Sequence, residues 1–234
     1  MSDEVEYYFT SVSHDPDSHF GVYGYATMDF DKDSDSTSPI ESSISYKFFN
    51  LKSTNVAELE VRAIHEAVKQ GIAKSLDFAI VTHHYCSVQA LNKLSKNLIK
   101  TLSKYKESYL HDTLKHIYVD IAILISNVAR FKGFITVKSK NVDDATQIKF
   151  IQSHNKYIGN LKALQMSEGN KIVSNAMYKH LLNVMNVDSV NTMNSQGVNI
   201  VNNSSTVNVL NYNDYLLLDN IVIEDNSDWL NAYT

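Results

Sequence analysis

The chain has 234 residues, of which 44% are hydrophobic and 20% charged, and its formal net charge at pH 7 is −5. This composition indicates a soluble globular protein with a sizeable core. The longest uncharged apolar run, residues 121–129, is far shorter than the roughly 20 residues that span a bilayer, so we expect no membrane span. The chain shows no signal-peptide pattern, and its single cysteine, Cys86, can form no internal disulfide. A cytoplasmic location is therefore expected, with a nuclear one still open.

The first third of the sequence predicts three strands, over residues 5–13, 21–30 and 43–49, arranged as an antiparallel meander. The segment between the second and third strands is rich in Asp and Ser and contains a proline, which is typical of a surface loop. A helix is expected over residues 53–75, because it begins with Ser, Thr and Asn, has acidic residues in its first turn and shows helical apolar spacing.

The middle of the sequence alternates strands with helices. Residues 76–81 form a continuous apolar run, which predicts a strand buried on both faces of a parallel sheet. Two amphipathic helices follow, over 87–109 and 110–131. A short strand at 134–140 and a helix at 143–158 complete the order β-β-β-α-β-α-α-β-α.

The composition changes near residue 165, and we divide the chain into a domain over 1–160, a helical extension over 161–190 and a tail over 191–234. The extension contains one amphipathic helix. The tail is rich in asparagine, and its end regains acidic and aromatic residues, so we expect it to be flexible or docked on a partner. The residues expected to bind that partner are Tyr215, Leu217, Ile221, Trp229 and Tyr233.

The weakly acidic net charge conceals a basic middle segment. Residues 93–162 carry thirteen Lys or Arg side chains against five Asp or Glu. Such a segment can bind phosphate backbones through counterion release, although a solvated helix face is the alternative interpretation. The residues predicted to contact nucleic acid are Lys93, Lys96, Lys100, Lys104, Lys106, Lys138 and Lys140.

Several motifs resemble those of the ribonuclease H family. VEYYFTSVS, at residues 5–13, is similar to the family's opening strand, whose pattern is roughly Phe-Thr-Asp-Gly-Ser. Nine residues separate Ser13 from the Tyr23-Gly24 pair, and bacterial-type enzymes have the same gap before their own Tyr-Gly. TNVAELEVRA resembles the family's Asn-x-x-Glu-Leu helix start, and AIVTHHYCSV lies where the family has an apolar strand followed by Thr-Asp-Ser.

The resemblance implies an α/β fold of the type 1 ribonuclease H-like class, with a mixed five-stranded sheet flanked by helices. It also implies a site at which four carboxylates hold two divalent cations. Here Ser11 takes the first position, Glu58 or Glu60 the second, His83 the third and Gln147 the fourth. For the second position, the apolar periodicity of the helix favours Glu60, whereas the match to the family's Glu-Leu motif favours Glu58. One carboxylate cannot hold two Mg²⁺ ions, so we expect a pseudoenzyme without cofactor or metal.

The remaining hypotheses belong to three classes. The first is a binding module for RNA or an RNA:DNA duplex, and the second is a protein-interaction or self-assembling scaffold that uses the tail. The third is a residual metal-dependent nuclease, in which His83 and His84 with one glutamate, and with His14 as a further candidate, would suit Zn²⁺ or Mn²⁺ better than Mg²⁺. Adjacent strand residues point to opposite faces, which argues against a shared ion for His83 and His84. Degenerate domains of the resembled family occur in viral and mobile-element proteins, so an accessory role of that kind is an expectation by analogy.

Overall fold

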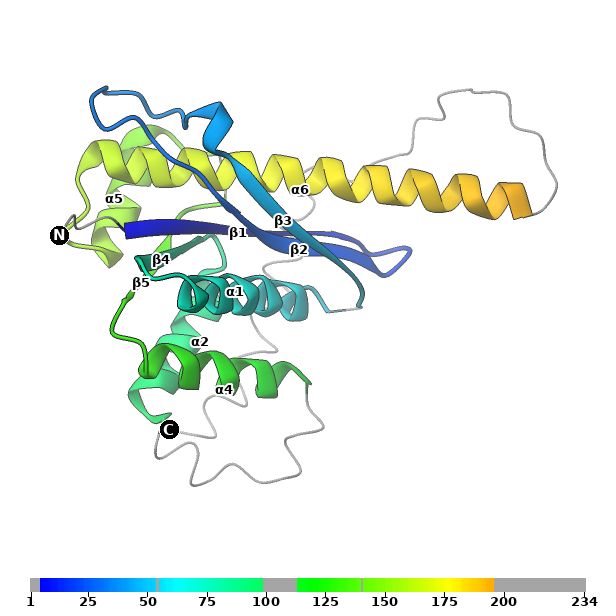
Figure 1. Ribbon diagram of the computed structural model, residues 1–234, viewed down its shortest axis with the longest axis horizontal. Helices are drawn as coiled ribbons and strands as arrows, with labels where there is room; N and C mark the ends of the chain where they lie inside the picture. Colours follow the sequence, from blue (N-terminus) through cyan, green and yellow to red (C-terminus); the bar gives the residue numbers. More distant parts are fainter. Residues whose placement is uncertain (1–4, 54, 99–112, 140, 196–234) are drawn as a thin grey trace.

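The computed structural model describes residues 5–53, 55–98, 113–139 and 141–195. Its centre is a mixed five-stranded sheet in the order β3-β2-β1-β4-β5 (Figure 1). The α/β class and the mixed five-stranded sheet expected from the sequence are thereby confirmed. The strands are β1 (Val5–Asp15), β2 (Phe20–Thr27), β3 (Ser45–Lys52), β4 (Asp77–Thr82) and β5 (Phe131–Thr136).

The sheet joins an antiparallel half to a parallel half. β1 pairs antiparallel with β2, from Tyr8 opposite Thr27 to Asp15 opposite Phe20, and β2 pairs antiparallel with β3. β4 lies between β1 and β5 and is parallel to both. All its residues except Asp77 are buried, which explains why its sequence is a continuous apolar run.

Helices cover both faces of the sheet. α1, α2 and α4 lie on one face, and α5 and α6 on the other (Figure 1). Side-chain caps start two of them, because Asn55 accepts the backbone N–H of Ala57 before α1 and Asp143 accepts that of Thr146 before α5. The helices are α1 (Val56–Ala73), α2 (Tyr85–Lys96), α4 (Thr113–Ser126), α5 (Asp144–His154) and α6 (Asn160–Ser195), with a short 3-10 turn, η1 (Glu41–Ser43).

Two hydrophobic cores separate along β1, because successive strand residues point to opposite faces. Tyr8 belongs to the core under α1, α2 and α4, and Phe9 to the core under α5 and α6. α6 approaches the sheet closely at Gly169, where an added Cβ would collide with the ring of Phe9. Glycine is needed there to let the helix backbone approach β1.

α6 is a structural part of the domain. It spans the segment set apart as an extension over 161–190 and continues to Ser195. Ala163, Met166 and Val173 of this helix are fully buried against the sheet. Among the described residues, no helix is long and apolar enough to cross a membrane.

Candidate functional site

Three of the four positions that the resemblance assigns to metal ligands lie beneath α6. Each of them contacts one member of a row of small polar side chains on that helix, which we call the α6 polar stripe: Ser167, Asn170 and Ser174. The spacing of three and four residues places these side chains on one helix face. All three are buried, with at most 5% of their surface exposed.

Hydrogen bonds that involve no carboxylate connect this stripe to the sheet. The hydroxyl oxygens of Ser11 and Ser174 lie 2.9 Å apart, and Ser11 is fully buried. The Asn170 side-chain amide donates to the backbone carbonyl of Thr10 at 3.0 Å, and its Oδ1 lies 3.2 Å from Nδ1 of His83. Helix α6 therefore fills the space next to Ser11 with neutral groups.

Gln147 makes an equivalent set of contacts from α5. Its side-chain amide nitrogen donates to Ser167 Oγ at 2.7 Å, and its Oε1 accepts the backbone N–H of Lys138 at 3.2 Å. The amide group thus pairs with both a donor and an acceptor. A carboxylate here would keep the bond from the N–H and could accept one from the Ser167 hydroxyl, but it could not donate to the Lys138 carbonyl, which lies 3.4 Å from the Gln147 amide nitrogen, so the site suits a glutamine.

Glu60 lies on the opposite face of the sheet, inside the core under α1, α2 and α4. Its carboxylate lies 3.0 Å from Nδ1 of His84 and accepts a hydrogen bond from Ser87 at 3.1 Å. Tyr118 donates to the Ser87 hydroxyl at 3.0 Å. Burial raises the pKa of Tyr118 above its usual value, and the nearby Glu60 carboxylate adds to this effect. The group is a buried polar network that joins α1, α2 and α4.

Glu58 lies two residues earlier on α1, about half a helical turn away, and is partly exposed. Both Nε and Nη2 of Arg62 donate to one of its carboxylate oxygens, at 2.9 and 2.7 Å. The other oxygen accepts from Ser53, whose backbone carbonyl lies 2.8 Å from Nε2 of His14. Its carboxylate is thus held by an arginine and a serine.

The candidate ligands are therefore split between two faces of the sheet. His83 contacts the α6 polar stripe and His84 contacts Glu60, although their rings lie only 4.0 Å apart between centroids. Within the described ranges, no group of three or more His, Cys, Asp or Glu side chains lies close enough together to hold a metal ion. The arrangement offers hydrogen bonds and packing rather than a cluster of carboxylates.

A second candidate surface follows α2, and we call its residues the α2 stripe: Tyr85, Gln89, Lys93 and Lys96. Their spacing of four, four and three residues places them on one face of the helix. Gln89 and Lys96 are exposed, whereas Tyr85 and Lys93 are half-buried. The opposite side of α2 packs into the core through buried apolar residues, so the stripe is the outward face.

Aromatic side chains from α5 extend the α2 stripe at its Tyr85 end. The rings of Tyr85 and His154 lie 5.1 Å apart, and the ring of Phe150 lies 4.8 Å from that of His154. Lys138 places its ammonium group 5.3 Å from the centre of Phe150. The cluster combines flat rings with an exposed cation, which is a combination that binds bases and phosphates.

Not every predicted site residue can be placed. Lys93, Lys96 and Lys138 lie on this surface. Two sets lie outside the described residues: the lysines Lys100, Lys104, Lys106 and Lys140, and the tail residues Tyr215, Leu217, Ile221, Trp229 and Tyr233.

Sequence reasoning missed both the α6 polar stripe and the aromatic extension of the α2 stripe. The first had a weak signal, since Ser167, Asn170 and Ser174 recur at helical spacing beside Gly169. The second had none, because Tyr85 and His154 are 69 residues apart and only the fold brings them together.

Comparison with known proteins gives no match: no family model, no curated protein and no solved structure matches the chain. A function for this chain therefore rests on its own residues.

Proposed function

We propose that the chain belongs to the ribonuclease H-like class and has lost the metal chemistry of that class. Its support is the sequence resemblance together with the order of the elements, in which an antiparallel meander, a helix and a buried parallel strand follow one another. The loss of chemistry is supported by Ser11, His83 and Gln147, which replace carboxylates and pair with the α6 polar stripe.

Within that class, this protein acts as a binding module for RNA or an RNA:DNA duplex. The observation that carries this proposal is the surface formed by the α2 stripe together with Lys138, Phe150 and His154. Its lysines can release counterions from a phosphate backbone, and its rings offer stacking surfaces to bases or sugars. The excess of thirteen basic over five acidic side chains in residues 93–162 agrees with this role.

The test is a binding titration on duplex RNA, hybrid and single strands at several salt concentrations. The variant carries Lys93→Gln, Lys96→Gln and Lys138→Gln together. We expect the wild-type chain to show a steep salt dependence, and its slope to become shallower by about 0.7–0.9 logarithmic units for each phosphate that the variant no longer neutralises. The control is Lys171→Gln, which removes an exposed lysine of α6 that pairs with Glu168.

Two results would contradict the proposal. Binding that is absent, or that the triple variant leaves unchanged, would exclude the α2 stripe as a nucleic-acid interface. Cleavage of a hybrid with Mg²⁺ or Mn²⁺, abolished by changing Glu58 and Glu60 to Gln, would show that the chain has kept nuclease activity.

A further inference from the structure

β3 is an edge strand of the sheet, with β2 on its inner side (Figure 1). The carbonyl oxygen of Lys47 points toward Gly24 of β2, where it would meet an added Cβ. Because the backbone groups of successive strand residues alternate in direction, those of Tyr46, Phe48 and Asn50 point away from β2. Among the described residues, no hydrogen bond is made to these outward N–H and C=O groups. β3 therefore presents an open hydrogen-bonding edge.

The side chains of β3 combine aromatic rings with positive charge. Tyr46 is 43% exposed, and Phe48 and Phe49 are half-buried on opposite faces of the sheet. Lys47 and Lys52 are exposed, and the sequence of the strand contains no acidic residue. Two copies of the chain paired through this edge would bring their lysines together. The edge thus opposes pairing with itself and suits an acidic strand.

The part of the chain that follows α6 contains a segment with the matching properties. Residues 196–234 carry five Asp or Glu and no Lys or Arg. Within them, residues 219–225 read Asp-Asn-Ile-Val-Ile-Glu-Asp, a β-branched run with acids at both ends. Such a composition has a high strand propensity.

The charges of the two segments match in spacing. Lys47 and Lys52 are five positions apart, and Asp219 and Glu224 are also five positions apart. An antiparallel strand can therefore place Glu224 opposite Lys47 and Asp219 opposite Lys52 at the same time. Opposite charges that face each other across two strands stabilise the pair.

The same register also matches the apolar side chains. It places Ile223 opposite Phe48 and Val222 opposite Phe49, and pairs of an aromatic with a β-branched residue stabilise neighbouring strands. A parallel strand with the same charge pairs would instead place Asn220 opposite Phe48. The antiparallel register is therefore favoured.

The connection from α6 is long enough for this pairing. α6 passes beside β3, since the ring of His180 lies 5.4 Å from that of Phe48. A helix rises about 1.5 Å per residue, so Ser195 lies about 22 Å further along α6. Residues 196–218 can span up to about 75 Å. A tethered segment also meets the edge at an effective concentration of up to about millimolar, which a second copy in dilute solution does not reach.

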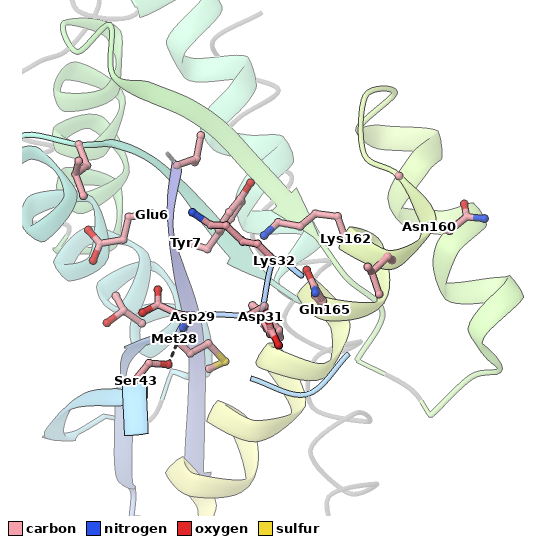
Figure 2. A pocket seen from close by; sticks show the side chains of 16 residues that line it. Glu6, Tyr7, Met28, Asp29, Asp31, Lys32, Ser43, Asn160, Lys162 and Gln165 are labelled. Atoms are coloured by element: carbon pink, nitrogen blue, oxygen red, sulfur yellow. Dashed lines mark hydrogen bonds between the residues drawn. The ribbon is translucent and has the colours of Figure 1, made fainter. Parts of the chain in front are cut away.

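A pocket at the start of β1 is a less suitable place for an acidic segment (Figure 2). The charged residues of its lining are three carboxylates and two lysines: Glu6, Asp29, Asp31, Lys32 and Lys162. An acidic segment would meet an excess of negative charge there.

We propose that residues 219–225 add to the sheet as a sixth strand, antiparallel to β3 and in the same molecule. The outward N–H and C=O groups of β3 then gain backbone partners, and its lysines gain carboxylates. The segment and β2 enclose β3 between them, which removes the open edge.

Amide hydrogen exchange of the full chain, followed residue by residue by NMR, tests the proposal. We expect the outward amides of Tyr46 and Phe48 to be protected, as are the inward amides of Lys47 and Phe49 that face β2. Ile223→Pro removes the N–H that faces Phe48 in this register, so it should abolish the outward protection. The inward protection should stay unchanged, which shows that the fold is intact.

Charge reversal tests the register. Lys47→Glu places a like charge opposite Glu224 and should lower the protection of the outward amides by about two- to thirtyfold. Combining it with Glu224→Lys should restore the protection. The matched control is Lys156→Glu, which reverses an exposed charge in the turn after α5 and should change nothing.

Four results would overturn the proposal. They are unprotected outward amides in the wild-type chain, outward protection that survives Ile223→Pro, a charge swap that restores nothing, and outward protection that rises with protein concentration. The last result would identify a second copy as the partner of β3. Binding of the acidic segment to the α2 stripe would give the first result, because it would leave the edge of β3 open.

Discussion

Replacement of Ser11 by aspartate would return a carboxylate to the first position of the resembled metal site. Ser11 is fully buried, and its hydroxyl lies 2.9 Å from that of Ser174. One serine hydroxyl can donate only one hydrogen bond to the new carboxylate, so the charge would remain largely uncompensated. An unpaired buried charge destabilises a protein by about 3–5 kcal/mol. We expect Ser11→Asp to lower the free energy of unfolding by about that amount at pH 7, a large fraction of the roughly 5–15 kcal/mol typical of a domain.

The pH dependence distinguishes a charge effect from a steric one. Burial would raise the pKa of the new carboxyl group above about 3.9, its unfolded value, so the folded chain would keep its proton longer than the unfolded chain. The stability gap between Ser11→Asp and the neutral, equally large Ser11→Asn should therefore widen as the pH rises from about 4 to 7. Urea unfolding followed by far-UV circular dichroism at pH 4, 5.5 and 7 measures it. A gap independent of pH, or Ser11→Asp as stable as wild type and further stabilised by Mg²⁺, would refute a neutral site closed by α6.

Three further changes test other parts of the molecule. In Gly169→Ala, the added methyl group would clash with Phe9 and destabilise the fold by roughly 1–3 kcal/mol, and the higher helix propensity of alanine would offset about 1 kcal/mol of that loss. A variant that is more stable than wild type in urea unfolding would contradict the close approach of α6 to β1. Burial lowers the pKa of His65, so the unfolded chain binds its proton more readily and stability should fall below about pH 6.5. An imidazole NMR titration should place the His65 midpoint below that pH, and a midpoint above it would reverse the sign. Glu60→Leu should cost about 1–3 kcal/mol in urea unfolding because Ser87 loses its buried acceptor, whereas Glu60→Gln, which keeps an acceptor, should cost less; equal losses would argue against the network.

The order of the helices and strands could be predicted because it depends on the local periodicity of apolar residues. The alternation before residue 50 indicated the meander, and the apolar run at 76–81 indicated the central parallel strand. Both patterns arise from residues that are close in sequence. The mixed sheet and its helical layers followed from them.

The role of α6 could not be predicted in the same way. A helix that presents serine, asparagine and glycine toward a core looks polar in sequence, and a polar face is ordinarily placed in solvent. Only the position of β1 shows that Ser174 and Gly169 face the sheet. The composition near residue 165 gave no sign that this helix packs into the core beside β1.

The pairing of α6 with β1 also constrains the order in which the chain can fold. Ser11 and Ser174 are separated by 163 positions, so one face of the sheet stays uncovered until nearly all of the described chain has been synthesised. That face carries Phe9 and Val81, both fully buried in the native state. During synthesis it is an apolar surface open to wrong partners, and such surfaces favour aggregation and slow folding. A chain that ends at residue 160 would keep that exposure permanently, so α6 is needed to cover this face of the sheet.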